Sequence, residues 1–302
     1  MAISRSQLVK ELEPGLNALF GLEYKRYENQ HAEIYTNENS DRAFEEEVML
    51  SGFANAQVKG EGAGVSFDEA QETFTARYTH ETVALAFAIT EEAIEDNLYD
   101  RLASRYTKAL ARSMSNAKQV KAVEPLINGL PSGSFQSGDG VSLFNTTHPT
   151  INGSFKNTLS TAADLNETSL EQSLIDIAQM TDERGLKVAA RGVKMIIPSE
   201  LQFTAERLMK SQGRTGTADN DINAIVSMGM IPQGYRVNNY LTDTDAFYII
   251  TDVPNGMKMF TRAPLTTAME GDFDTGNVRY KARERYSFGV SDPRGIFASP
   301  GA

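Results

Sequence analysis

His148 is the residue whose type best suits it to catalysis. It lies in the segment LFNTTHP, residues 143–149, directly after two threonines. Because histidine titrates near neutral pH, it could act as a general base toward a nearby hydroxyl. The segment contains no nucleophile elbow and no helical pair of metal ligands, which favours a structural histidine that fixes the loop before Pro149. His80, at the junction of two expected strands, has the same interpretation, and a hydrolase using His148 is the enzymatic alternative.

A glycine-rich segment, residues 60–64, resembles a phosphate-binding loop only in its composition. Gly60, Gly62 and Gly64 would allow a close approach of the backbone to a phosphate. No Lys-Ser or Lys-Thr pair follows them, and no helix is predicted to begin there. We therefore expect a flexible arm.

Two acidic segments begin like calcium loops but do not continue as such. After the start at residues 219–223, Ala224 and Met230 occupy positions that need glycine and a bidentate glutamate. Asp272 and Asp274 begin a similar pattern, but Arg283 stands at its last ligand position. We expect no metal site, no cofactor site and no catalytic residue in this chain.

Basic residues alternate with apolar ones over the segment 278–290, which predicts one long strand with one buried face. The basic positions are Arg279, Lys281, Arg283 and Arg285. In a chain of net charge −11, contacts with protein are a better interpretation of this row than a grip on nucleic acid. Glu284 interrupts the pattern with a carboxylate on the apolar face. A buried charge is costly unless it is paired, so we expect Glu284 to form an ion pair between subunits or between domains.

The composition excludes most metal and redox chemistry. The chain has 302 residues, with 29 basic and 40 acidic side chains, three histidines and no cysteine. Disulfide bonds, thiolate zinc sites, iron–sulfur clusters and cysteine nucleophiles are therefore excluded. The acidic balance argues against free nucleic acid as a partner, because such binding depends on basic groups that neutralise phosphates.

The hydropathy pattern predicts a soluble protein made in the cytoplasm, without a membrane as partner. The first residues lack the charged and then apolar pattern of a signal peptide. The longest apolar run, Val83–Ile89, is far shorter than the roughly 20 residues that span a bilayer.

The first half of the chain is predicted to contain extended, projecting elements. Residues up to about Glu47 are polar and suggest an extended arm with one short helix near Ile3–Leu12, closed by Pro14 and Gly15. Period-two alternation then predicts strands over 74–78 and 83–89, which together with the glycine-rich segment before them suggest a long β-arm.

A long helix is predicted to follow this arm, with Thr90 as N-cap and Pro125 as its end. At 1.5 Å per residue its length would be about 45 Å. Its apolar positions recur at three- and four-residue steps: Ile94, Leu98, Leu102, Tyr106, Ala109, Leu110, Met114, Ala117 and Val120.

The second half predicts a loop over 129–153 and then a compact α/β region. A capping box over 168–171 opens a helix that is stopped at Gly185, and a second helix begins at 198–202. The predicted strands are 193–197, 235–241, 246–251, 257–261 and the long strand 278–290. The long helix and the long strand are expected to pack lengthwise.

Three segments resemble the major capsid proteins of tailed bacteriophages, especially the group of the Mu-type major head subunit. The run YTHETVALAFAIT, residues 78–90, continued as far as Tyr99, is similar to the stretch leading into the spine helix of that family. Residues 143–149 are similar to a further motif, and YSFGVSDPRG, residues 286–295, is similar to the final strand and exit. The resemblance implies a fold of the Hong Kong 97 type.

That resemblance implies an α+β chain in five segments. Residues 1–45 would be the N-terminal arm, and 46–89 the extended β-hairpin E-loop with its return strand. Residues 90–124 would be the spine helix of an elongated peripheral domain. Residues 125–262 would form a compact axial α/β domain, and 263–302 would return to the peripheral domain with the long strand.

The implied function is structural and not enzymatic. Copies would assemble as pentamers and hexamers into an icosahedral shell around packaged double-stranded DNA, with each E-loop over a neighbouring subunit. The protein would be part of the virion, assembled in the bacterial cytoplasm, and its acidity suits a wall that encloses DNA without holding it. The encapsulin-like shell of a bacterial nanocompartment, which shares the fold, is the main alternative.

The same resemblance implies several partners. The arm is too short for a built-in scaffolding domain, which implies a separate scaffolding protein. A portal is expected, and a decoration protein is compatible with the resemblance. Nothing in the sequence identifies a lysine–asparagine pair for covalent cross-linking.

Overall fold

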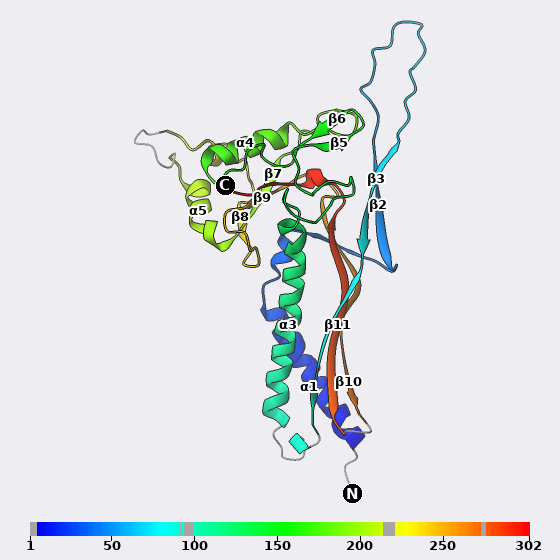
Figure 1. The fold of residues 1–302 in the computed structure, drawn as a ribbon, viewed down its shortest axis with the longest axis vertical. Helices are drawn as coiled ribbons and strands as arrows, with labels where there is room; N and C mark the ends of the chain where they lie inside the picture. The colour runs from blue at the N-terminus through cyan, green and yellow to red at the C-terminus, as the bar shows by residue number, and fades with distance from the viewer. Residues whose placement is uncertain (1–4, 91, 94–98, 214–220, 273–275) are drawn as a thin grey trace.

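The computed structural model describes residues 5–90, 92–93, 99–213, 221–272 and 276–302. The chain forms an elongated stem and a smaller, compact part at one end of it (Figure 1). In chain order the elements are α1 (Arg5–Arg26), η1 (Gln30–Glu33), β1 (Thr36–Asn39), β2 (Phe44–Leu50), β3 (Glu72–Thr79), β4 (Glu81–Ile89), α3 (Tyr99–Ile127), β5 (His148–Thr150), β6 (Gly153–Phe155), α4 (Glu167–Ala178), β7 (Gly192–Ile197), η2 (Ser199–Leu201), α5 (Gln202–Lys210), α6 (Ala224–Met228), β8 (Tyr235–Val237), β9 (Phe247–Thr251), β10 (Met257–Gly271), β11 (Val278–Val290), η3 (Pro293–Gly295) and β12 (Ile296–Ser299).

The stem is a four-stranded sheet in the order β1-β10-β11-β4, which we call the long sheet. Strand β11 has the predicted bounds and pairs antiparallel with both β10 and β4. Helices α1 and α3 pack on one face of this sheet and bury an apolar cluster that includes Phe20, Met114 and Tyr280. The predicted lengthwise packing of long helix and long strand is confirmed (Figure 1).

Helix α1 is longer than predicted. The expected short helix near Ile3–Leu12 continues through Pro14 and ends at Arg26, and residues 1–4 lie outside the described part of the chain. Proline inside a helix removes one hydrogen bond and crowds the preceding turn. Burial of Leu16 and Phe20 between α3 and the long sheet outweighs that cost, so tertiary packing overrides the local signal.

Helix α3 runs past its predicted end at Pro125 to Ile127, and its buried face is rotated from the predicted one. Tyr106 and Val120 are exposed, whereas Thr107 and Gln119 are buried. The prediction placed only apolar residues on the buried face of this helix, but polar residues also lie there. The buried Gln119 side chain, for example, accepts a hydrogen bond from the backbone N–H of His31 (3.0 Å). Thr90 Oγ1 accepts a 3.4 Å bond from Ala93 N. The structure describes α3 from Tyr99, so Thr90 as the N-cap of the long helix stays a prediction. The predicted positions Ile94 and Leu98 lie outside the described residues.

The compact part is built on a second sheet, β12-β9-β7-β8, which we call the small sheet. Helices α4 and α5 cover it and enclose an apolar core around Leu170, Ile177 and Phe247. The capping box of α4 lies two residues earlier than predicted: Ser169 N donates to Asn166 Oδ1 (2.9 Å) and Asn166 N to Ser169 Oγ (3.0 Å). The helix ends at Ala178, so Gly185 belongs to the following turn and not to a helix stop.

Other boundaries in this region also changed. The strand predicted over 235–241 ends at Val237, and the loop predicted over 129–153 contains the short strand β5. Strand β10 continues ten residues beyond its predicted end at Thr261, to Gly271. Its register shifts between Thr261 and Thr266 accommodate Pro264, which has no N–H to donate to the sheet.

Two of the passages between the two sheets lie side by side. The turn after β9 leads into β10, and the turn after β11 leads back into β12, the edge strand of the small sheet. The two turns touch, because Ser291 N donates to Gly256 O (3.0 Å) and Asp292 N to Asn255 O (2.9 Å). A Cβ atom on Gly295 would lie 2.3 Å from the Cα of Gly256, so only glycine allows this approach. We call this crossing the junction.

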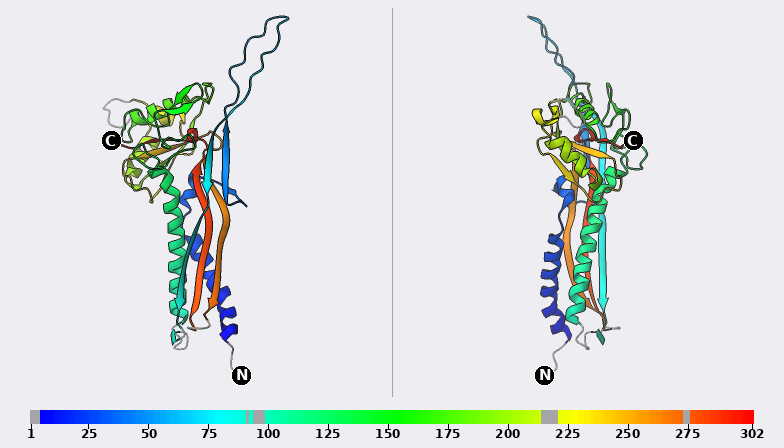
Figure 2. Two further views of the ribbon diagram at one scale, coloured as in Figure 1. Left: turned by 45° about the vertical axis from the view of Figure 1, so that its right-hand side comes forward. Right: turned by 90° about the vertical axis from the view of Figure 1, so that its left-hand side faces the viewer.

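A hairpin of β2 and β3 leaves the stem, and residues 51–71 extend from it as a projecting loop (Figure 2). Strands β3 and β4 confirm the predicted extended segments, but they do not pair with each other, because β4 joins the long sheet. Strands β1 and β2 lie in the region interpreted as an extended arm. Strand β2 was not predicted because it contains three consecutive glutamates, which interrupt the alternation of apolar and polar residues.

Within the described residues, we find no helix long and apolar enough to cross a membrane.

Candidate functional site

The projecting loop is the most exposed apolar segment that the structure describes. The side chains of Val58 and Phe67 are 99% and 97% exposed. Ala63 N donates to Gly60 O (3.1 Å) at the tip, where Gly62 has a positive φ of 77°. The glycines therefore form a turn of the predicted flexible arm. Large apolar side chains this exposed are typical of a surface that a partner covers.

The base of the projecting loop contacts the compact part of the same chain. Arg184, after α4, donates from Nη2 to the carbonyl oxygen of Glu69 (2.6 Å), and Asp68 Oδ1 lies 4.0 Å from the same guanidinium. Within the loop, Asp68 Oδ2 accepts a bond from Ala54 N (2.7 Å). These contacts orient the loop before any partner is present.

A buried lysine anchors the hairpin to the long sheet. Lys258 of β10 contacts Glu38 of β1 (3.0 Å) and Glu47 of β2 (2.5 Å). Burial lowers the pKa of Lys258, but the two carboxylates outweigh this effect and raise it above the usual value. The hairpin is therefore fixed at its root by Lys258, in addition to the contacts of Arg184 at the base of the loop.

The long sheet has one face without helices, and the basic row lies on it. Arg279, Lys281 and Arg283 are exposed, opposite the helix-covered side chains of Tyr280 and Ala282. Arg279 forms an ion pair with Asp272. In β4, the residues beside this row are the exposed alanines Ala84, Ala86 and Ala88. A flat, basic surface with small neighbours suits contact with an acidic protein surface.

Glu284 is paired, but inside its own chain. Its side chain is 2% exposed, and Oε2 lies 3.1 Å from Lys118 Nζ of α3. The hydroxyl of Tyr24 in α1 donates to Oε1 (3.2 Å). Burial, with Glu284 as the second cause, raises the pKa of Tyr24 far above its usual value, so the phenol stays protonated. The predicted need for an ion pair is confirmed, whereas its placement between subunits or domains is wrong: Glu284 joins α1, α3 and β11.

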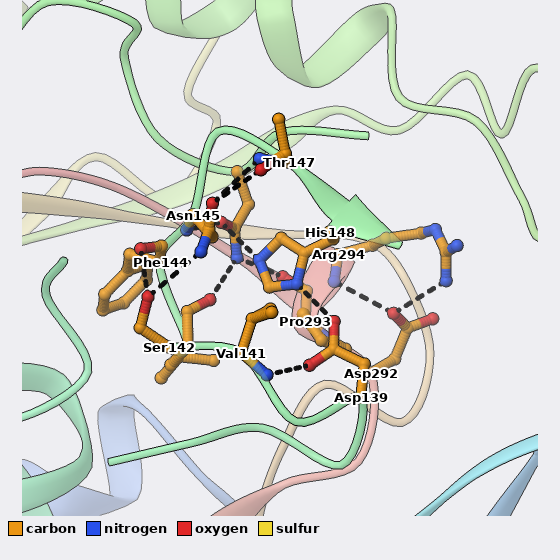
Figure 3. A network of polar contacts seen from close by, with 12 residues as sticks. Asp139, Val141, Ser142, Phe144, Asn145, Thr147, His148, Asp292, Pro293 and Arg294 are labelled. Atoms are coloured by element: carbon orange, nitrogen blue, oxygen red, sulfur yellow. Dashed lines mark hydrogen bonds and ion pairs between the residues drawn. The ribbon is translucent and has the colours of Figure 1, made fainter. Parts of the chain in front are cut away.

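His148 is buried and bonded at both ring nitrogens (Figure 3). Nδ1 lies 2.6 Å from Asp139 Oδ2, and Nε2 lies 2.9 Å from Asn157 Oδ1. The ring stacks on Phe155, its partner in the β5–β6 pairing, with 4.7 Å between centroids. A general base must reach the proton that it removes. With 0% exposure and no free nitrogen, His148 has no access to a substrate, so the structural interpretation holds and the hydrolase hypothesis is wrong.

The C-terminal turn beside His148 contains a second buried ionic group. Arg294 donates from Nη2 to Glu183 Oε1 (2.6 Å), from Nη1 to Asp292 Oδ1 (3.2 Å) and from Nε to the carbonyl oxygen of Thr181 (2.7 Å). Its guanidinium lies 4.1 Å from the ring centroid of Phe155. Burial raises the pKa of Asp292, against the opposing effects of Arg294 and His148. Figure 3 shows that this group and His148 adjoin.

The other two histidines are also structural. His80 lies between the hydroxyls of Ser40 (2.9 Å) and Ser287 (3.0 Å), and burial with nearby Arg285 lowers its pKa. Burial and Lys118 lower the pKa of His31 to about 4, so its ring is neutral.

The calcium-like segments provide no site that the structure supports. Asp219, Asn220 and Asp274 lie outside the described residues. Among the residues that are described, no group of three histidine, aspartate or glutamate side chains is arranged to hold a metal ion.

Comparison with known proteins shows which family this chain belongs to. Residues 72–299 match the family described as phage capsid protein. This chain belongs to the phage capsid protein family. It is accordingly a structural component of the virion and not an enzyme. No curated protein matches the chain.

Solved structures of shell proteins match this phage capsid protein along most of its length. The capsid of an empty GTA particle matches with a TM-score of 0.58 and 14% identity, covering 91% of each chain. The capsid of Myoviridae phage XM1 matches with a TM-score of 0.53 and 11% identity, covering 89% of each chain. A virus-like particle from Pyrococcus furiosus gives a TM-score of 0.51 and 11% identity, covering 94% of this chain and 97% of the other. The predicted α+β capsid fold is confirmed.

Proposed function

We propose that copies of this phage capsid protein assemble as pentamers and hexamers into an icosahedral shell that encloses packaged double-stranded DNA. The observation that carries this proposal is the projecting loop. It exposes Val58 and Phe67, and its contacts with its own chain lie near its base, at Asp68 and Glu69. A neighbouring copy is the surface that would cover these side chains.

The five segments inferred from the family resemblance are part of this proposal. The long sheet with α3 would be the peripheral domain, and the small sheet with α4 and α5 the axial domain. The projecting loop would be the E-loop, with β2 starting at Phe44, slightly before the expected boundary. The closer kinship with the Mu-type head subunit rests on the runs 78–90, 143–149 and 286–295.

A separate scaffolding protein and a portal are proposed as partners in assembly, with a decoration protein compatible with the finished shell. The net charge of −11 supports a wall that does not hold the packaged DNA. The likeness to a virus-like particle concerns the fold, whereas the family match concerns phage capsid proteins. Particles purified from producing cells would distinguish a phage shell, which contains double-stranded DNA, from a nanocompartment, which contains a cargo protein.

The role of the projecting loop is tested by replacing Val58 and Phe67 together with serine. We expect the variant to remain folded, because both side chains are almost fully exposed, but to form few or no shells in electron micrographs. Lys59→Ser, beside Val58, is the matched control and should assemble normally. Wild-type yields of shells from the double variant would contradict the proposal.

A further inference from the structure

A pocket lies beside the end of α3, between this helix and the strands β3, β4 and β11, with a volume of about 270 Å³. Thr79, Glu81, Glu124 and Tyr286 are among the residues that line it, and His148 and its bonding partners are not. Sites for small-molecule ligands occupy about 300–1,000 Å³, so this pocket suits a single small group.

The charges along the pocket favour a cation. Lys121 forms an ion pair with Glu81, and Glu124 supplies a second carboxylate. In the part of the chain that the structure describes, no hydrogen bond or ion pair engages the Glu124 side chain. Helix α3 ends at Ile127 without a basic residue in its last turn, so no cation there offsets the negative end of the helix dipole. Two carboxylates and a helix C-terminus thus lie beside a single lysine.

The hydroxyl of Tyr286 is a second, independent indication of a ligand. Tyr286 is 2% exposed, and its buried hydroxyl has no hydrogen-bond partner among the described residues. Burial raises the pKa of this phenol, and the carboxylates of Glu284, Glu81 and Glu124 add to the effect. Glu284 is paired with Lys118, whereas Glu81 and Glu124 line the pocket. The protonated hydroxyl therefore lies in the field of the pocket and lacks a partner that a ligand can supply.

We propose that this pocket binds the ammonium end of an alkylamine. Its N–H groups would donate to the Glu124 carboxylate and to the hydroxyl oxygen of Tyr286. The alkyl chain would lie against Pro125 and Phe135, which also line the pocket. Free amines and the lysine side chains of other copies both carry this group, and the pocket recognises the same chemistry in either. The inference does not depend on how the copies assemble.

Binding is measured by titrating the full-length, unassembled chain with n-butylammonium chloride at pH 7 and constant ionic strength. Tetramethylammonium chloride is the matched probe, because it has the same charge but no N–H donor. We expect butylammonium to bind at least about tenfold more tightly and to shift the NMR signals of the Tyr286 ring. Equal affinities for the two probes, or unchanged ring signals, would overturn the proposal.

Tyr286→Phe and Glu124→Gln test the two groups that would hold the ammonium. Each should weaken the binding of butylammonium by about tenfold. Tyr286→Phe removes a hydroxyl that no other described residue bonds, so without amine it should resist urea at least as well as the wild type. Glu61→Gln, at an exposed position of the projecting loop, is the control and should bind normally. Wild-type affinity in either pocket variant would refute the site.

Assembled shells distinguish the two sources of the ammonium group. Shells that bind butylammonium as tightly as the unassembled chain does indicate a free amine. Shells in which the pocket no longer binds the probe indicate a lysine side chain of a neighbouring copy, and Glu124→Gln should then also lower the yield of shells. Both results require binding by the unassembled chain, so its absence there contradicts the proposal for either source.

Discussion

The hydroxyl of Tyr24 donates to the carboxylate of Glu284 over 3.2 Å, although the two residues are 260 positions apart in the chain. Lys118 contacts the same carboxylate from a second helix. Three elements of the stem therefore meet at one buried charge. Because this charge is satisfied within the chain, it contributes to the stability of the subunit before any shell forms.

Glu284→Gln should destabilise the isolated chain by about 2 kcal/mol, since a hydrogen bond to a buried charge contributes about 1.5–3 kcal/mol. Urea unfolding of unassembled protein measures this difference. The control is Lys121→Gln, which removes a more exposed ion pair with Glu81 and should cost less than about 1 kcal/mol. A loss seen only in assembled shells would instead support a contact between subunits.

Gly295→Ala should disturb the junction strongly. The added Cβ would overlap the backbone at Gly256, and overpacking of this kind costs about 1–3 kcal/mol. Gly64→Ala, where a Cβ meets no atom within 4 Å, is the matched control and should leave thermal unfolding unchanged. Equal melting temperatures of Gly295→Ala and wild type would show that the turns can separate without cost.

We expect the buried His31 ring to lower the free energy of unfolding in acid. Its folded pKa of about 4 is lower than the unfolded value, so the unfolded chain binds more protons between about pH 6.5 and 4. Stability from this group is complete above pH 6.5 and is lost as the pH falls toward 4, by up to about 1.4 kcal/mol per pH unit. His31→Leu should flatten the acid side of the stability curve in urea titrations. An unchanged slope would contradict a buried neutral ring.

Arg184→Ala should loosen the base of the projecting loop without unfolding the chain. The bond from Arg184 to Glu69 would be lost, while the hairpin remains anchored by Lys258. We expect faster cleavage within residues 52–70 by a protease that cuts beside apolar side chains. Lys59→Ala, at the tip, should not change the rate. Equal cleavage of all three proteins would show that Arg184 does not orient the loop.

Reversing the charge at Lys281 and Arg283 should impair assembly and leave folding intact. Both side chains are exposed on the face of the long sheet that the helices leave open. We expect normal urea unfolding but fewer shells by light scattering, with the defect increased at low salt. Arg105→Glu on the outer side of α3 is the control, because it changes charge away from that face. Normal assembly of the double variant would exclude the basic row as a contact surface.

The parts of the fold that depend on local periodicity were predictable. The bounds of β11 follow from thirteen alternating residues, and the strand over 193–197 follows from an apolar run. The path of α1 through Pro14 was not predictable, because its stability comes from Leu16 and Phe20 packing against distant elements. The pairing of β2 with β3 was not predictable for a similar reason. The glutamates of β2 are neutralised by partners such as Lys258 that are remote in sequence.

For the candidate residues too, the local sequence predicted the role but not the distant partners. The sequence indicates that Glu284 needs a partner, because an acidic residue occupies a buried position in a strand. It cannot identify Lys118 and Tyr24, which reach that position from two helices. His148 was correctly interpreted as structural from the absence of a catalytic motif around it. Its link to Pro293 through Asn157 depends on a contact over 136 residues, which no local pattern reveals.

The return of the chain from β11 to β12 has a consequence for protein synthesis. Strand β12 completes the small sheet beside β9, with Ile296, Phe297 and Ala298 fully buried. A ribosome that has not yet made residues 296–299 therefore holds a chain whose compact part lacks an edge strand. A chain that ends before β12 would leave β9 without this partner strand and its apolar neighbours exposed. The small sheet is therefore complete only once β12, the last strand that the structure describes, has been made.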